Sequence, residues 1–206
     1  ADNYILRDTS EYRVLNLTVS PFNDGITSYL HHSIGGYHGA KIRRYQDLID
    51  HSISMELSRF TSALNQLRSF EQVDSIMEDL NALNMLNTKY IIISPDRPPL
   101  VNNNALGNAW FVNSYRLADN PDEEIEMLNQ INPAKELVVN KKHAEKLEDL
   151  NPDARQDGNI ELVSYKANEL VYDYSSPEKQ VAVFSEIYYP KGWNAYVDGE
   201  PADHFR

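Results

Sequence analysis

The chain has 206 residues, a formal net charge of −12 and no cysteine. This length is enough for one large domain or two small ones with a hydrophobic core. The negative charge argues against a nucleic-acid partner, because an acidic surface repels phosphate backbones. Without cysteine the chain has neither disulfides nor thiolate metal sites.

The first half of the chain combines strand and helix patterns. Alternating apolar residues predict a strand over residues 12–19, and apolar residues three or four positions apart predict helices over 40–49, 52–67 and 73–86. A short run of apolar residues at 90–93 predicts a fully buried strand. No apolar run is long enough to span a bilayer.

The second half is richer in strand patterns. A loop with three prolines and three asparagines at 95–104 precedes a predicted strand over 109–117, a helix over 121–130 and a strand over 136–139. One helical turn is expected near 145–150. Further strands are predicted over 160–166, 169–174, 181–189 and 193–197.

These patterns predict an α+β fold. A mixed α/β lobe with several helices is expected over residues 1–157, and a small antiparallel β-sandwich over residues 158–206. Within the second lobe, Asp198-Gly199 predicts a two-residue hairpin turn.

The most basic segment of the chain spans residues 31–46 and contains no acidic residue. Its paired glycines at 35–36 and a following helix could bind an anion such as phosphate. Alternatively, the arginines are solvated or paired with Asp47 and Asp50. The candidate ligand-binding residues of this segment are His38, Lys41, Arg43 and Arg44.

Three histidines of the same segment, His31, His32 and His38, could form a metal site with Asp24. Adjacent residues of an extended segment point to opposite faces, so His31 and His32 are poorly placed to share one ion. We therefore expect no metal site.

Aromatic residues gather near the C-terminal end. Trp193 and Tyr196, with Tyr188 and Tyr189, could form a platform on which a sugar stacks. Alternation along a strand sends some of these rings into the core instead. Trp193 and Tyr196 are the candidate ligand-binding residues of this group.

Three carboxylates, Asp198, Glu200 and Asp203, raise the alternative of a hydrolase with a carboxylate pair. Asp198 is better explained as the first residue of the hairpin turn. No nucleophile–base pair or phosphate-binding loop is evident, so we expect neither a catalytic residue nor a cofactor in this chain.

Three stretches together resemble the YfhO-like family of bacterial membrane proteins. The first runs from Tyr-Arg-Val-Leu-Asn-Leu at 12–17 to Arg-Arg-Tyr-Gln at 43–46. The second is Leu-Asn-Met-Leu-Asn-Thr-Lys-Tyr-Ile-Ile at 83–92. The third is Ser-Glu-Ile-Tyr-Tyr-Pro-Lys-Gly-Trp-Asn-Ala-Tyr-Val-Asp-Gly at 185–199, which resembles the segment before the last membrane helix of that family.

The resemblance implies a location and a role. The chain would be a domain on the extracytoplasmic (periplasmic) face of the cytoplasmic membrane, and its partner would be the transmembrane portion of its own full-length chain. The family is similar to glycosyltransferases that take sugar from polyprenyl-phosphate donors, and their catalytic acid lies in the membrane portion. The domain would then assist sugar transfer to a cell-envelope glycan or glycolipid without catalysing it. Family sequences continue beyond the position of Arg206, so the sandwich is expected to lack its last strands.

Two other functions stay open at this point. The first is a carbohydrate-binding or structural module of a membrane protein without transferase activity. The second is a free-standing hydrolase that uses the C-terminal carboxylates.

Overall fold

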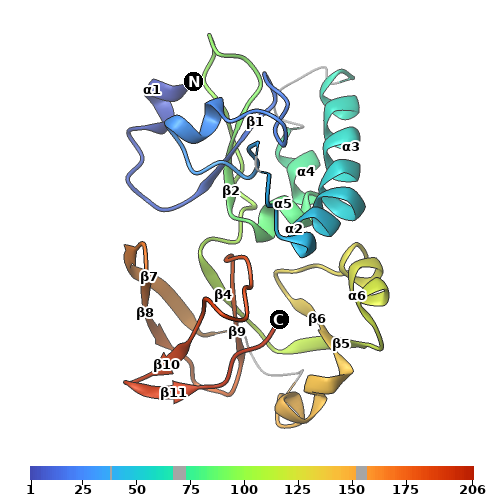
Figure 1. Ribbon diagram of the computed structural model, residues 1–206, viewed down its shortest axis with the longest axis vertical. Coiled ribbons are helices and arrows are strands. Elements are labelled where there is room, and N and C mark those ends of the chain that lie inside the picture. Colours follow the sequence, from blue (N-terminus) through green and yellow to red (C-terminus); the bar gives the residue numbers. More distant parts are fainter. Residues whose placement is uncertain (38, 67–72, 152–156) are drawn as a thin grey trace.

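The computed structural model describes residues 1–37, 39–66, 73–151 and 157–206. The chain has both helices and strands, and the strands form small separate sheets, which confirms the predicted α+β class. Figure 1 shows two lobes stacked along the long axis, with β1–β3 and α1–α5 in the upper lobe and β4–β11 with α6 in the lower lobe. None of the described helices combines the length and the apolar composition that a membrane crossing requires.

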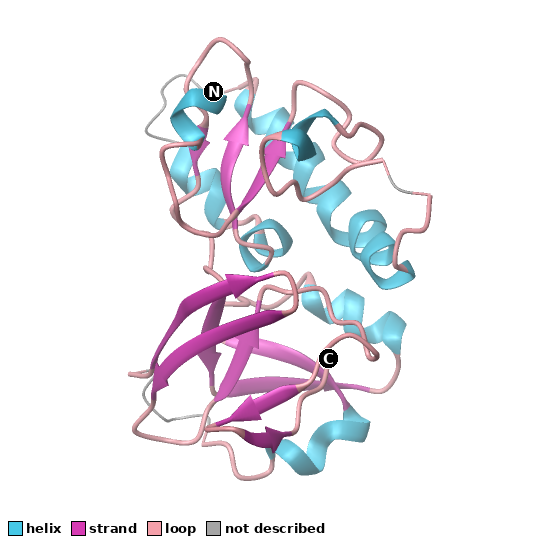
Figure 2. Cartoon of the chain, turned by 60° about the vertical axis from the view of Figure 1, so that its left-hand side comes forward, coloured by secondary structure: helices cyan, strands magenta, loops and turns pink. Residues whose placement is uncertain are grey.

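The upper lobe is built on one three-stranded sheet. The central strand β2 pairs parallel to β1 and antiparallel to β3, and Leu15 lies opposite Ile91. Both side chains are fully buried, as expected for apolar strands covered on both faces. Figure 2 shows the helices packed around this sheet. The elements are α1 (Asp2–Ile5), β1 (Arg13–Asn16), η1 (Ile26–Tyr29), β2 (Thr88–Ile92) and β3 (Leu100–Val101).

The two helices predicted over 40–49 and 52–67 form one continuous helical stretch. Helix α2 (Arg43–Leu48) runs through a π-helical segment, η2 (Ile49–Ile53), into α3 (Ser54–Leu64). No glycine or proline interrupts residues 43–64, so nothing breaks the helix between the two apolar patterns. The predicted end at residue 67 lies outside the described residues.

The apolar pattern of this stretch predicts that Met55 is buried, but the structure buries the carboxylate of Glu56 instead. Met55 is exposed, whereas Glu56 is only 3% exposed. The Glu56 carboxylate accepts hydrogen bonds from the backbone N–H groups of Ala82 (2.7 Å) and Leu83 (3.1 Å). These groups belong to the first turn of α5, which has no side-chain cap of its own. Burial raises the pKa of Glu56 to about 7.

The helix predicted over 73–86 is divided into α4 (Val73–Glu78) and α5 (Asn81–Met85). The break falls at Leu80, whose backbone leaves the helical region with φ −88° and ψ 60°. After α5 the chain turns into β2 through Asn87, which has φ 53°. Asparagine tolerates this left-handed conformation better than most residues.

The lower lobe consists mainly of two-stranded sheets. The predicted strand over 109–117 is two strands separated at the buried Asn113, and each pairs with a different partner. β4 is antiparallel to β9, whereas β5 is parallel to β6. The elements are β4 (Ala109–Val112), β5 (Ser114–Ala118), α6 (Pro121–Leu128), β6 (Glu136–Asn140), η4 (Lys141–Leu147), β7 (Asn159–Lys166), β8 (Glu169–Ser175), β9 (Val181–Phe184), β10 (Ala195–Val197) and β11 (Glu200–Ala202).

The pairing of β4 with β9 crosses the boundary predicted between residues 157 and 158. Strands on both sides of that boundary therefore share one sheet, and Figure 1 places β4, β5 and β6 in the lower lobe. The predicted strand over 181–189 ends at Phe184, because the chain then leaves the sheet to contact the upper lobe.

The predicted hairpin turn at Asp198-Gly199 is confirmed. Asp198 has φ 52° and Gly199 has φ 85°, the two positive values of a type I′ turn. The turn places Val197 opposite Glu200 in the β10–β11 hairpin.

We expect Gly199→Val to destabilise the protein by about 1–3 kcal/mol, the typical energy of a strained backbone conformation. No heavy atom lies within 4 Å of the position of the added Cβ, so backbone strain alone causes the loss. Urea unfolding measures the effect. Gly25→Val is the matched control, because Gly25 also faces open space but has φ −103°. Equal stability of the two variants would contradict the positive φ at Gly199.

The buried Glu56 predicts a pH-dependent stability. Because its folded pKa is about 7 and its ordinary value is 4.5, the folded protein retains a proton that the unfolded chain releases. Its contribution is therefore complete below pH 4.5 and is lost as the pH rises through about 7. Relative to Glu56→Gln, which cannot ionise, the wild type should lose up to about 3 kcal/mol of unfolding free energy across that window.

Urea unfolding of both proteins at a series of pH values checks this prediction. Glu126→Gln is the control, since Glu126 is exposed. A constant difference between wild type and Glu56→Gln at every pH would contradict the raised pKa.

Candidate functional site

A guanidinium group joins the two lobes. Arg13, at the start of β1, donates from Nη1 to the backbone oxygens of Leu86 (3.0 Å) and Ser185 (2.7 Å), and its Nη2 lies 3.2 Å from Glu186 Oε2. Both charged side chains are less than one fifth exposed. In addition, Ile187 packs against the main core of the upper lobe. Residues 185–187 are thus attached to both lobes.

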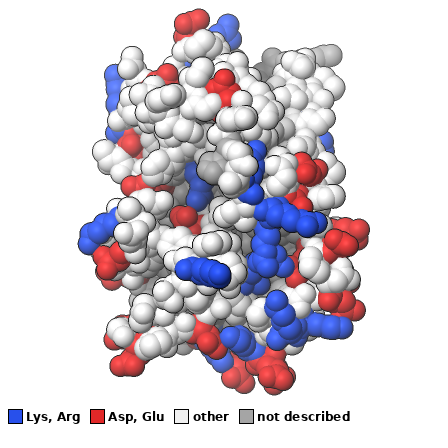
Figure 3. Space-filling model, viewed as in Figure 1, with Lys and Arg blue, Asp and Glu red and all other residues white. Residues whose placement is uncertain are grey.

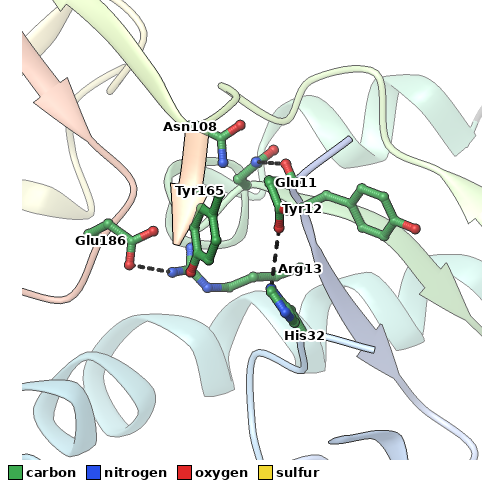
Figure 4. A pocket seen from close by; sticks show the side chains of 8 residues that line it. Glu11, Tyr12, Arg13, His32, Asn108, Tyr165 and Glu186 are labelled. Carbon is green, nitrogen blue, oxygen red and sulfur yellow. Dashed lines mark hydrogen bonds and ion pairs between the residues drawn. The ribbon is translucent and has the colours of Figure 1, made fainter. Parts of the chain in front are cut away.

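Next to Arg13 lies a small polar pocket, drawn in Figure 4. Its volume of about 20 Å³ has room for about one water molecule. Inside it, His32 Nδ1 is 3.7 Å from Glu11 Oε2, and the His32 ring lies 5.9 Å from the Tyr165 ring. Burial, followed by the charge of Glu186, raises the pKa of Tyr165. The pocket is too small for a substrate, and its polar groups mainly hold the joint together. Its lining residues are Glu11, Tyr12, Arg13, His32, Asn87, Asn108, Tyr165 and Glu186.

A larger cavity of about 330 Å³ adjoins this pocket and shares Glu11, Asn87 and Asn108 with it. This volume lies at the lower end of the range for small-molecule sites. The exposed Asn103 adds a further amide group, whereas Asn102 is buried with its amide bonded to Asn84 and Thr88, and Lys89 is paired with Asp8. Such a lining offers hydrogen-bond donors and acceptors to a neutral polar ligand. The sequence patterns did not predict this cavity, although the run of asparagines at 102–104 is a sign of it in the sequence.

The basic segment divides between structural and exposed roles. Lys41 donates to the backbone oxygen of Phe22 (3.2 Å) and lies 5.7 Å from the centre of the Phe22 ring. Arg43 is exposed and has no ion pair among the described residues. Arg44 lies over the ring of Tyr188, 5.8 Å from its centre. No ion pair joins either arginine to Asp47 or Asp50 within the described ranges. His38 lies outside the described residues.

The aromatic segment also serves more than one role. Trp193 is partly buried and donates from Nε1 to the backbone oxygen of Ile187 (3.2 Å), which closes the turn that contains Gly192. Tyr196 is 63% exposed on β10. Tyr188 faces Arg44 on one side and His204 on another, with 6.0 Å between the Tyr188 and His204 ring centres.

Arg206 completes this arrangement from the end of the chain. Burial lowers its pKa; the charge of Glu124 opposes this shift, and the positive charge of Arg44 adds to it. Its Nη2 also forms an ion pair with Glu124 of α6. We call Arg44, Tyr188, His204 and Arg206 the arginine–tyrosine site. The sequence predicts Arg44 as a ligand-binding residue and Tyr188 as part of the aromatic platform, but it gives no sign of His204 and Arg206, which are distant from α2 in the chain.

Figure 3 shows the charge distribution around this region. Lys and Arg side chains form a band that crosses the middle of the displayed face and continues over the lower lobe. The band contrasts with the net charge of −12 of the chain. A local excess of positive charge beside exposed aromatic rings suits an anionic ligand that also has an apolar face.

The two adjacent histidines have separate partners. His31 is buried and its Nε2 lies 2.8 Å from Asp2 Oδ1, whereas His32 pairs with Glu11. Within residues 1–37, 39–66, 73–151 and 157–206, no three histidine, aspartate or glutamate side chains form a metal-binding group.

The C-terminal carboxylates are similarly dispersed. Asp198 occupies the hairpin turn, and Asp203 Oδ2 pairs with Lys146 Nζ at 2.8 Å. This ion pair lowers the pKa of Asp203. A hydrolase with a carboxylate pair needs both groups to face one substrate, and Asp198 and Asp203 are not placed in this way.

Comparison with known proteins finds no family model that matches the sequence and no significant match to a curated protein or a solved structure.

We expect Arg13→Met to lower the unfolding free energy by about 2 kcal/mol, because Glu186 loses its cation and two partly buried carbonyl groups lose a charged donor. Arg116→Met is the matched control: its pair with Glu136 is more exposed, so its loss should stay below about 1 kcal/mol. Urea unfolding compares the two variants. Equal losses would show that Arg13 does not join the lobes energetically.

Proposed function

We propose that this chain is a non-catalytic extracytoplasmic domain of a multi-pass membrane protein, and that it helps to transfer sugar from a polyprenyl-phosphate donor to a cell-envelope glycan or glycolipid. The placement of Arg44 over Tyr188, next to Arg206, carries the proposal. A sugar linked to a phosphate presents both chemistries that these residues match, since its phosphate attracts arginine and its apolar ring face stacks on tyrosine.

The position of the arginine–tyrosine site supports a binding role. The site lies between the lobes, with Arg44 from the upper lobe and Tyr188 from the segment that Arg13 holds in place. Arg44 has no carboxylate partner among the described residues, so its charge is available to a ligand. Arg206 is neutralised by Glu124, so Arg44 supplies the charge that a bound phosphate would neutralise.

A second candidate is a carbohydrate-binding module in a membrane protein that transfers no sugar. The cavity favours it through Asn103 and Asn108, because amides recognise the hydroxyl groups of a neutral glycan, whereas Asn87 and Asn102 are buried and bonded within the protein. The two functions differ in whether the phosphate is needed for binding.

A binding experiment distinguishes them. The chain is titrated with a short-chain isoprenyl-phosphate-linked hexose, with the free hexose and with inorganic phosphate, and NMR chemical shifts report the affinity. We expect Arg43→Ala with Arg44→Ala to weaken binding of the phosphate-linked hexose at least about tenfold, the loss of one or two charge-assisted contacts. The variant should fold normally, because exposed charges contribute less than about 1 kcal/mol.

Arg7→Ala with Arg97→Ala is the matched control, since it removes the same charge from two exposed arginines elsewhere. In the full-length protein the Arg43/Arg44 variant should reduce sugar transfer at a normal protein level. Equal binding of the free and the phosphate-linked hexose would favour the second candidate. Absence of binding of any of these probes by the wild type would reject both candidates.

A further inference from the structure

The loop between β1 and α2 exposes large apolar side chains. Ile26 is 61% exposed, Tyr29 87%, Leu30 55% and Tyr37 77%. Residues 25–37 are called the Tyr29 loop below. Single exposed apolar residues are ordinary, but four within twelve positions form a patch that indicates an interaction surface.

The loop reverses the usual pattern of burial. Around η1 the polar residues Thr27 and His31 are buried, whereas their neighbours Ile26, Tyr29 and Leu30 face outward. The inward position of His31 is held by its contact with Asp2. These three exposed apolar side chains contribute no hydrophobic stabilisation to the folded domain. Their placement instead suits burial against a partner.

The loop is held in shape by contacts along its length. Asp24 Oδ1 accepts from the backbone N–H of Ile26 (2.7 Å), and the N–H of Gly36 donates to the backbone oxygen of Pro21 (2.7 Å). Ser33 forms a bridge with Val14 of β1. The patch is therefore presented on an ordered scaffold, which lowers the entropy lost on docking.

Positive charge borders the patch. Residues 25–46 contain no acidic residue but include Lys41, Arg43 and Arg44, while two carboxylates contact the loop from outside this range, Asp24 at Ile26 and Asp2 at His31. Lys41 is tied to Phe22 at the base of the loop, so this charge lies beside the apolar residues.

This combination fits the surface of a lipid bilayer. Tyrosine favours the boundary between headgroups and acyl chains, because its ring is apolar and its hydroxyl is polar. Leucine and isoleucine supply apolar area for the same boundary, and lysine and arginine attract anionic headgroups. The net charge of −12 is unfavourable for contact with anionic lipid, but exposed charges more than about 8 Å apart are largely screened at physiological salt, so the local charge of the docking face decides.

We infer that the Tyr29 loop docks on a bilayer that contains anionic lipid, with Ile26, Tyr29, Leu30 and Tyr37 inserted at the interface. The inference rests on the proposed place of the domain beside a membrane but not on its sugar binding. Lys41, which contacts Phe22 at the base of the loop, is the basic residue placed beside the inserted side chains.

Vesicle sedimentation tests the inference. The chain is mixed with vesicles of phosphatidylcholine alone and with vesicles of phosphatidylcholine and phosphatidylglycerol at a ratio of about 4:1, both free of glycan. The wild type should bind the anionic vesicles at least about tenfold more tightly, as two or three basic residues at the surface imply, and added salt should remove this preference. Tyr29→Ser with Leu30→Ser should weaken binding to both vesicle types at least about tenfold.

The control is Val163→Ser with Tyr174→Ser, which removes two exposed apolar side chains from the lower lobe. Circular dichroism verifies that every variant is folded. Three results would overturn the inference: no binding of the wild type to either vesicle type, unchanged binding of the loop variant, or an equal loss in the control. A dimer that the loop variant abolishes, without vesicle binding, would assign the patch to a second copy of the chain instead.

The sugar-phosphate titration of the Arg43/Arg44 variant is made in solution without vesicles. Failure of membrane docking and failure of the proposed function therefore give separate results.

Discussion

The contacts of Arg13 are the constraint on which the arrangement of the two lobes depends. One guanidinium group bonds the end of α5, through Leu86, and the segment after β9, through Ser185 and Glu186. Arginine suits this role because its donors lie in a rigid plane and its charge is never lost near neutral pH. The segment it holds continues directly into Ile187, which enters the upper core, and Tyr188, which meets Arg44. Two further hydrogen bonds join the lobes, from Asn81 Nδ2 to the Ile131 oxygen and from Asn129 Nδ2 to the His51 oxygen, but neither holds the aromatic segment.

The site follows from that joint. Its residues come from α2, from the segment after β9 and from the end of the chain, and each set has a separate structural anchor. Arg206 is fixed by Glu124 of α6, and Trp193 closes the turn that follows Tyr188. Glu124 balances the charge of Arg206, whereas Arg44 has no carboxylate partner among the described residues, so the uncompensated positive charge of the site is that of Arg44.

The proposed membrane contact and the arginine–tyrosine site occupy consecutive parts of the same segment. The Tyr29 loop exposes apolar side chains, and Lys41 after it is hydrogen-bonded to Phe22 at the base of the loop. The guanidinium group of Arg44 lies over the ring of Tyr188. A ligand with an isoprenoid tail and a phosphate headgroup would be met in the same order, first by the apolar loop and then by the arginines. The polar cavity near Asn102 lies beyond the joint and suits a neutral group more than a charged one.

The sequence alone determined the features that depend on neighbouring residues. Apolar periodicity and turn chemistry predicted the α+β class, a buried strand at 90–93 that the structure has at 88–92, and the type I′ turn at Asp198-Gly199, because spacing and glycine act locally. Tertiary structure decided the rest. It joined two predicted helices through a π-helical segment and buried Glu56 in place of Met55, since a distant helix start needed its carboxylate. It also paired β4 with β9 and brought Arg206 to Arg44, contacts between residues far apart that no local pattern specifies.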